Sequence, residues 1–228
     1  MSLRDATPDN CETCGRPTLV CVCDRLPHHT PKRRVLILQH PREQDVVLGT
    51  ATLVAQALDH TTLSVGMSWR SLAHALGEKE ADPHDWGVLF PGKADDKPAA
   101  HPGMIATDRN GERVRVDKLK GIVVLDGSWS QAKTLWWRNA WLLKLNRLQV
   151  TPKEPSIYGK LREEPRREFV STLEAVGAAL TACGETPSIE ADLRRAFRTM
   201  IQRARDAGLG APAPRRPVAP KPRSRRPR

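Results

Sequence analysis

The chain has 228 residues, of which 39% are hydrophobic, so it is long enough to form one domain with a substantial core. No stretch approaches the roughly 20 apolar residues that cross a bilayer, and the first ten residues lack the pattern of a secretory signal. We therefore expect a cytoplasmic protein without a membrane segment. The formal net charge is +11, and seven of these charges are cations in 211–228, a segment without acids. Such a tail favours a polyanion, with RNA the natural partner; a solubilising extension is the alternative.

Four of the five cysteines lie within thirteen residues near the N-terminus. Cys11, Cys14, Cys21 and Cys23 form two closely spaced pairs, a pattern that supplies four thiolates to a tetrahedral zinc ion. Four protein ligands leave no open position, so this zinc would be structural and would fold a segment too short to fold alone. Two disulfides or a redox pair are the alternatives, and the missing secretory signal favours zinc. We therefore predict a small four-cysteine zinc knuckle over residues 1–33.

The body of the chain, 34–208, alternates between apolar runs and helical patterns. Continuous apolar or β-branched runs predict strands at 34–39, 62–65, 87–90, 121–125 and 147–150. Apolar residues at helical spacing predict helices at 46–58, 71–76, 131–143, 171–183 and 188–207. Polar composition predicts loops at 93–111 and 156–167. This alternation is typical of an α/β domain with a mainly parallel sheet flanked by helices. The tail, 209–228, is rich in Pro and Arg, and we expect it to be disordered.

The clearest predicted strand, 121–125, runs directly into the turn Asp126-Gly127-Ser128-Trp129. In parallel sheets ligands bind at the carboxyl ends of strands, where a carboxylate such as Asp126 can accept a proton or a ligand hydroxyl. Trp129 is a candidate to stack on a nucleobase or an adenine. Each residue also has a structural alternative: Asp126 as a plain turn residue, Trp129 as a core residue, and Ser128 as the N-cap of the following helix.

Five motifs of the chain together resemble the DTW-domain family, which is named for an Asp-Thr-Trp signature. They stand in the family's order and span about residues 11–183. The motifs are Cys11-x-x-Cys14-x-Arg16-Pro17 with Cys21-x-Cys23, Leu38-Gln39-His40-Pro41-x-Glu43, Leu89-Phe90-Pro91-Gly92, Leu125-Asp126-Gly127-Ser128-Trp129-x-x-Ala132-Lys133, and Ser171-Thr172-Leu173-Glu174-Ala175. Ser128 stands where the signature has threonine, and it keeps the hydroxyl group.

The resemblance implies tRNA-uridine aminocarboxypropyltransferase activity with S-adenosylmethionine as the donor. It also implies a SPOUT-like fold with a C-terminal knot that holds the donor, which is a rare exception to ordinary chain topology. Asp126 is then expected either to act as a base toward the uracil nitrogen or to hold the ammonium group of the donor. Ser128 and Trp129 complete the expected catalytic set. The residues expected around the donor are Gln39, Pro91, Gly92, Leu125, Ala132, Tyr158, Thr172 and Glu174. For Glu174, a capping box with Ser171 is the structural alternative.

The predicted last helix carries five arginines that form a basic face for RNA. We assign RNA binding to Arg194, Arg195 and Arg198 among them. Two other functions stay open from the sequence: an RNA methyltransferase of the same broad fold, and a non-catalytic RNA-binding protein built on the zinc knuckle and the basic tail. The Asp-x-Ser-Trp turn favours the aminocarboxypropyltransferase. A binding module, in particular, does not explain a carboxylate beside a tryptophan after a buried strand.

Overall fold

The computed structural model describes residues 10–89, 103–151, 154–161 and 170–209. In this part of the chain, six strands form one sheet in the order β2-β1-β5-β3-β6-β4. The strands are β1 (Arg34–Gln39), β2 (Thr61–Val65), β3 (Trp86–Leu89), β4 (Gly103–Thr107), β5 (Gly121–Asp126) and β6 (Asn146–Thr151). Five of these strands run parallel, and β4 pairs antiparallel with β6 at one edge. The predicted α/β class with a mainly parallel sheet is confirmed.

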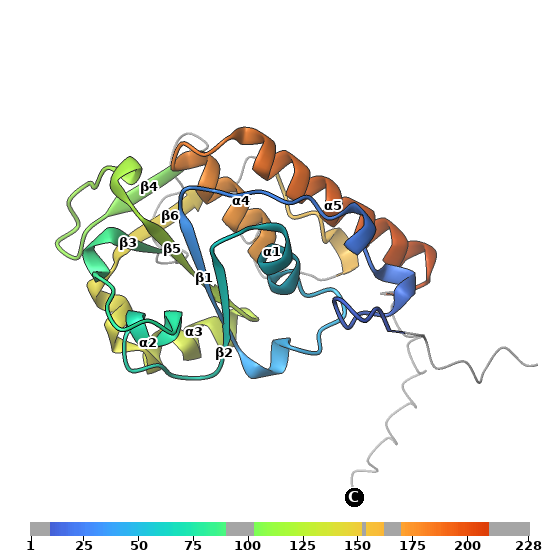
Figure 1. The fold of residues 1–228 in the computed structure, drawn as a ribbon, viewed down its shortest axis with the longest axis horizontal. Helices are drawn as coiled ribbons and strands as arrows, with labels where there is room; N and C mark the ends of the chain where they lie inside the picture. The colour runs from blue at the N-terminus through green and yellow to red at the C-terminus, as the bar shows by residue number, and fades with distance from the viewer. Residues whose placement is uncertain (1–9, 90–102, 152–153, 162–169, 210–228) are drawn as a thin grey trace, which may run out of the picture.

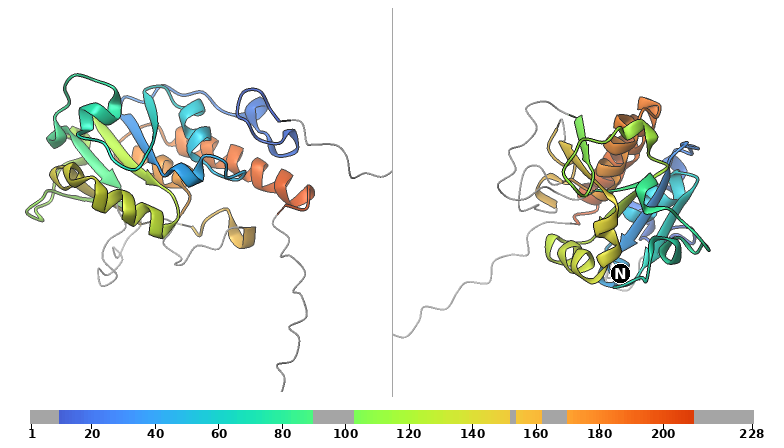
Figure 2. Two further views of the ribbon diagram at one scale, coloured as in Figure 1. Left: turned by 90° about the horizontal axis from the view of Figure 1, so that it is seen from below. Right: turned by 90° about the vertical axis from the view of Figure 1, so that its left-hand side faces the viewer.

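Helices cover both faces of the sheet (Figure 1). They are α1 (Ala51–Ala57), α2 (Leu72–Leu76), α3 (Trp129–Arg138), α4 (Thr172–Ala182) and α5 (Pro187–Asp206). One core joins α1, α4 and α5 to one face, and a second core joins α2 and α3 to the other. Along β1, Val35 and Ile37 enter the first core, whereas Leu36 and Leu38 enter the second. Burial on both faces explains why β1 is an uninterrupted apolar run. Figure 2 shows the sheet between these two layers from two further directions.

One predicted loop contains a strand. The prediction of a loop over 93–111 is wrong for β4, which pairs with β6 from Gly103 opposite Thr151 to Thr107 opposite Arg147. The local sequence gives no strand signal because β4 lies at the edge and only one of its residues is buried. Its hydrogen bonds come from β6, a partner about 40 positions away, so the strand depends on tertiary pairing.

The predicted helix over 131–143 is wrong at both ends, because α3 begins at Trp129 and stops before Asn139. The side chain of Asn139 donates to the carbonyl oxygen of Leu135 at 2.7 Å and accepts from the backbone N–H of Trp69 at 2.8 Å. These bonds replace the helical pattern, and the chain continues as a 3₁₀ turn over Ala140–Lys144.

The predicted helix over 46–58 is wrong at its start, because α1 begins only at Ala51. The buried guanidinium group of Arg16 donates to the carbonyl oxygen of Val47 at 3.1 Å and to that of Gly49. A side chain far away in the sequence thus holds the preceding loop out of the helix. The other predicted strands and helices agree with the structure to within one or two residues.

The N-terminal cysteine module packs against the helical layer. Val20 and Val22 are fully buried, and Val22 belongs to the core shared with α5. At the end of α5, Arg203 donates to the carbonyl oxygen of Cys21 and pairs with Asp24 at 3.1 Å. The module and the α/β body therefore share one packed interface.

The predicted tail beyond residue 209 lies outside the described residues. None of the helices described is long and apolar enough to cross a bilayer.

Candidate functional site

Two adjacent parallel strands bring together polar residues that are far apart in the sequence. β1 ends at Gln39 and β5 ends at Asp126, and the two residues are register partners. Both side chains are buried, and Gln39 Nε2 donates to Asp126 Oδ2 at 2.9 Å. The next residue after β1, His40, donates its backbone N–H to the carbonyl oxygen of Asp126 at 2.9 Å. The strand pairing thus fixes the Asp126 carboxylate at the carboxyl end of the sheet.

The start of α4 completes this cluster from a third segment. The hydroxyl group of Thr172 donates to Asp126 Oδ1, so each oxygen of the carboxylate accepts one bond from a neutral donor. Next to it, the backbone N–H of Leu173 donates to Oγ1 of the buried Thr50 at 3.2 Å. Thr50 is not among the predicted site residues, because its only signal in the sequence is a position just before a helix. Three predicted site residues, Gln39, Asp126 and Thr172, therefore form one hydrogen-bonded cluster, which we call the Asp126 cluster.

The turn after β5 leads directly into α3. Ser128 is the N-cap of α3 and forms a capping box with Gln131, so the structural alternative for Ser128 is confirmed. Ser128 is nevertheless exposed, and it stands two positions after Asp126. Trp129 is partly exposed, and Lys133 Nζ lies 5.1 Å from the centroid of its ring. A Cβ atom at Gly127 would lie 2.9 Å from Cβ of Gln131, so this tight turn requires a residue without a side chain.

Glu174 is a buried anchor for the segment that precedes α4. It forms the predicted capping box with Ser171 and also accepts from Ser156 Oγ at 2.9 Å and from the backbone N–H of Ile157 at 3.1 Å. Arg194 of α5 pairs with the same carboxylate at 3.3 Å. The structural alternative for Glu174 is confirmed. A contact of Glu174 with the donor stays a prediction.

Tyr158 lies in the core rather than at the Asp126 cluster. Its ring packs edge-to-face on Phe197, with the ring centroids 4.9 Å apart, and its hydroxyl group donates to the carbonyl oxygen of Leu48 at 2.7 Å. Tyr158 thereby fixes the loop before α1, and its contact with the donor stays a prediction. Leu125 and Ala132, also expected near the donor, are partly buried. Pro91 and Gly92 lie outside the described residues.

Two helices begin at the carboxyl end of the parallel strands, where Asp126 lies. The helix dipoles favour negative charge near the N-termini of α3 and α4, although Ser128, Ser171 and Thr50 already accept hydrogen bonds from N–H groups of their first turns. The Asp126 carboxylate lies between the two helix starts. The start of α4 already holds the buried carboxylate of Glu174, so the arrangement combines one site for a cationic or N–H group, at Asp126, with one helix start, that of α3, which favours an anionic group. It can therefore orient a zwitterionic amino-acid arm.

A family model for the DTW domain matches residues 8–205. The chain belongs to the DTW-domain family. This DTW-domain protein is similar to proteins named tRNA-uridine aminocarboxypropyltransferase 2 from Macaca fascicularis and Mus musculus, with 29% identity over 195 residues in each case. The matched region covers 83% of the chain and 61% of each relative. The protein of the same name from Drosophila melanogaster is 27% identical over 208 residues, which cover 88% of the chain and 76% of that relative. The chain thus spans about three fifths of the two mammalian proteins. No solved structure matches it significantly.

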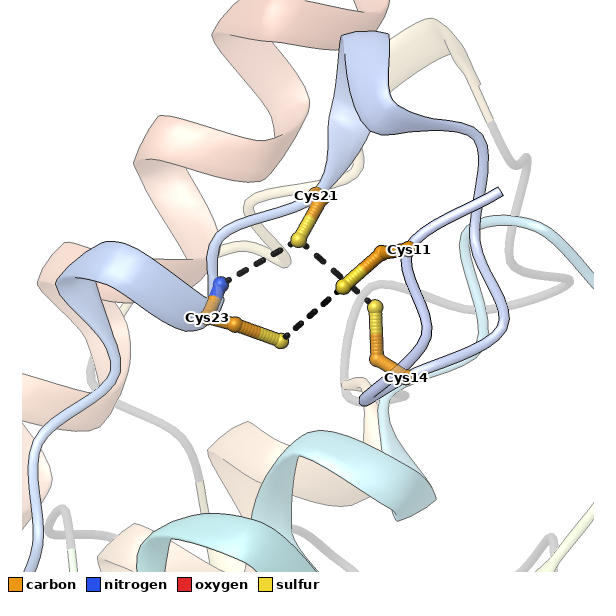
Figure 3. Close-up of side chains that lie close together, drawn as sticks. All are labelled: Cys11, Cys14, Cys21 and Cys23. Carbon is orange, nitrogen blue, oxygen red and sulfur yellow. Dashed lines mark hydrogen bonds between the residues drawn. The ribbon is translucent and has the colours of Figure 1, made fainter. Parts of the chain in front are cut away.

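The DTW domain as matched includes the cysteine cluster, whose four sulfur atoms lie within 4.8 Å of one another (Figure 3). The Sγ atoms of Cys11 and Cys23 are 3.9 Å apart, and those of Cys14 and Cys21 are 3.7 Å apart. Metal–sulfur bonds of about 2.3 Å in a tetrahedron place the sulfur atoms about 3.8 Å apart. The four cysteines therefore fit one metal ion. The pKa of Cys11 is lowered to about 6, mainly by a hydrogen bond from the backbone of Cys14. Burial raises the pKa of Cys21 and of Cys23.

Acidic partners neutralise the predicted RNA-binding arginines of the DTW domain. Each of the three forms an ion pair: Arg194 with Glu154 at 2.7 Å and Glu174 at 3.3 Å, Arg195 with Asp192 at 2.6 Å, and Arg198 with Glu154 at 3.6 Å. The Arg194 side chain is also mostly buried. Ion pairs of this kind reduce the positive charge that α5 offers to a polyanion. RNA binding by these arginines stays a prediction.

Proposed function

We propose that this protein transfers the 3-amino-3-carboxypropyl group of S-adenosylmethionine to a uridine in tRNA and releases methylthioadenosine. The observation that carries the proposal is the Asp126 cluster, which joins three separate motifs of the DTW domain at the carboxyl end of a parallel sheet. The names of the relatives support it, since all three are tRNA-uridine aminocarboxypropyltransferases by name. The proposal includes action in the cytoplasm, which five free cysteines support.

The reaction forms a bond between a uracil ring nitrogen and the γ-carbon of the amino-acid arm. The bond between that carbon and the sulfonium sulfur breaks, the sulfur keeps the electron pair, and the neutral thioether leaves. The nitrogen gives its proton to a base. The γ-carbon competes with two other carbons attached to the same sulfur, so the protein must select it by orientation. The Asp126 carboxylate and the start of α3 supply contacts for the two charged groups of the arm.

Asp126 has two candidate roles in this reaction. A carboxylate has about four lone-pair sites, and Gln39 and Thr172 occupy one on each oxygen, which leaves one on each oxygen for a substrate. One of these two free lone-pair sites either takes the uracil proton or holds the ammonium group of the donor. Trp129 is proposed to stack on the nucleobase or the donor, and the exposed Ser128 to bind the carboxylate of the arm. Gln39 and Thr172 then act by positioning Asp126.

The decisive experiment is mass spectrometry of nucleosides from unmodified tRNA incubated with the purified protein and S-adenosylmethionine. We expect a uridine that is heavier by one aminocarboxypropyl group. A methyl increment would instead identify an RNA methyltransferase with the same donor. No product on a tRNA that binds would support a non-catalytic RNA-binding protein.

The variant Asp126→Asn tests the assigned residue with little disturbance of the fold. Asparagine keeps one oxygen for the Thr172 hydroxyl, and rotation of the Gln39 amide restores the other hydrogen bond. Loss of a general base lowers kcat by about 10²–10⁴-fold at any donor concentration. Loss of an ammonium contact mainly raises the KM for S-adenosylmethionine. Unchanged kcat and KM would remove Asp126 from the chemistry. Asp59→Asn, at a partly exposed aspartate that contacts Thr30 and His28 away from the Asp126 cluster, is the matched control.

The proposal also covers the metal and the finer fold. We assign one structural zinc ion to Cys11, Cys14, Cys21 and Cys23, supported by the fit of their sulfur separations to a tetrahedral ion. We also assign a SPOUT-like fold with a C-terminal knot that holds the donor. The bonds from the start of α4 to Asp126 and Thr50 support this, because they bring the C-terminal part of the chain to the end of β5 and to the residue before α1.

A further inference from the structure

A long segment that begins directly after Asp126 contains cations but no acids. Between residues 127 and 153 the sequence has five lysines and arginines and neither aspartate nor glutamate, in a chain that is 28% charged. This segment includes α3 and the following 3₁₀ turn, Ala140–Lys144. It is the continuation of the turn that carries Asp126, so its charge lies on elements that begin at the proposed active site.

The structure describes four of the five cations of this segment, and all four lie at the surface. Lys133, Arg138, Lys144 and Arg147 are all exposed, and within the described residues none of them forms an ion pair. Lys133 instead lies over the ring of Trp129. By contrast, Arg194, Arg195, Arg198 and Arg203 of α5 each pair with an acid. Four exposed cations without an ion pair among the described residues therefore lie in the one segment that follows Asp126, although the sequence alone favours α5.

An exposed tryptophan lies among these cations. Trp137, in the last turn of α3, is 80% exposed, the highest value among the large hydrophobic residues described. The opposite side of the helix supplies the packing, since Leu135 is fully buried in the core beneath α3. The Trp137 ring thus contributes little to the core. A large aromatic ring in water, flanked by Lys133 and Arg138, has the composition of a surface that stacks on a nucleobase and contacts the neighbouring phosphates.

The position of this ring fits a substrate strand that enters the site. Trp129 and Trp137 stand eight residues apart on one helix, which corresponds to about 12 Å along its axis. The first lies beside Asp126 and the second at the far end of α3. A single strand that lies along α3 can therefore reach both rings at once. Its phosphates would meet the cations of 127–151, a segment that contains no aspartate or glutamate.

We propose that the outer surface of α3 and the following turn, formed by Lys133, Trp137, Arg138 and Lys144, docks an unpaired strand of the substrate RNA. Trp137 stacks on a base next to the target uridine, and the three cations contact phosphates. We call this surface the Trp137 face. The inference rests on the proposed function, because it takes tRNA as the substrate, and it assigns RNA docking to α3 instead of α5.

The test compares variants of the two candidate surfaces. Affinity for unmodified tRNA is measured by fluorescence anisotropy at several salt concentrations, with Trp137→Ala and Arg138→Gln/Lys144→Gln for the Trp137 face. Arg195→Gln/Arg198→Gln is the charge-matched variant of α5, and Leu19→Ala, at a residue 64% exposed on the cysteine module, is the apolar control. Thermal melts confirm folding of every variant. We expect Trp137→Ala to weaken tRNA binding about ten-fold or more. The double variant of the Trp137 face should lower the slope of log K against log salt by about 1–2.

The outcomes separate this inference from the proposed function. In the transfer assay, Trp137→Ala should raise the KM for tRNA while the KM for S-adenosylmethionine stays unchanged. Wild-type affinity in both variants of the Trp137 face would overturn the inference, and so would a loss of binding confined to the α5 variant. If the wild-type protein binds tRNA but forms no aminocarboxypropyl uridine, the proposed function fails and the binding measurements still decide the docking surface. If the wild-type protein binds no tRNA, the docking surface fails as well.

Discussion

Arg16 links the cysteine module to the loop before α1, and the variant Arg16→Met tests what that link contributes. The guanidinium group donates to the carbonyl oxygens of Val47 and Gly49, and the residue is only 5% exposed. Methionine keeps much of the apolar stem but removes both donors. The loop would then be held mainly by the hydrogen bond from Tyr158 to Leu48.

The expected magnitude follows from these contacts. A hydrogen bond from a charged group contributes about 1.5–3 kcal/mol. Two such bonds are lost, but one buried nitrogen of Arg16 has no partner, so its removal offsets part of the loss. We expect the free energy of unfolding to fall by about 2–4 kcal/mol. In a domain of this size each kcal/mol shifts the Tm by about 2–4 °C, so the Tm should fall by about 4–16 °C.

Thermal unfolding followed by circular dichroism measures this shift, with Arg25→Met as the control. Arg25 belongs to the same module, but it is exposed and pairs with its neighbour Asp24, so its loss should leave the Tm almost unchanged. A second readout tests positioning, because the loop leads into Thr50, which holds the start of α4. Well below the Tm, Arg16→Met should still raise the KM for S-adenosylmethionine. A Tm and a KM equal to those of the wild type would refute the reasoning.

Two further predictions concern the metal and the sheet. Elemental analysis of the purified protein should find about one zinc per chain, and Cys11→Ser/Cys14→Ser should lose it and expose the module to proteolysis; a fully folded, metal-free wild type would contradict the zinc assignment. In the sheet, a Cβ atom at Gly87 would lie 2.6 Å from Leu148, so Gly87→Ala should lower the free energy of unfolding by about 1–3 kcal/mol. Chemical denaturation of Gly87→Ala, Leu148→Ala and the double variant checks the cause, since additive effects would exclude a clash between these two residues.

The sequence predicts those features of this protein that depend on neighbouring residues. The strand β5 contains the β-branched run 122–124 because both of its faces are buried, and this pattern predicts a central parallel strand. Ser171 and Glu174 of the capping box are three positions apart, and the motif follows from this spacing alone. The same holds for the four cysteines, whose two short spacings leave little freedom in where the sulfur atoms lie.

Only the tertiary structure decides features that depend on contacts between distant segments. β4 forms because the edge of β6 offers it hydrogen bonds, and α3 ends where Asn139 reaches Trp69. The Asp126 cluster depends on the strand order, which sets β1 beside β5 and returns α4 to their ends. The sequence also shows five arginines on α5 but not the acids that pair with four of them, so it assigns the basic surface to the wrong helix if the docking proposal holds. Local sequence patterns indicate which residues are buried and how residues of a short motif are spaced. Pairing between distant segments is set by the three-dimensional path of the chain.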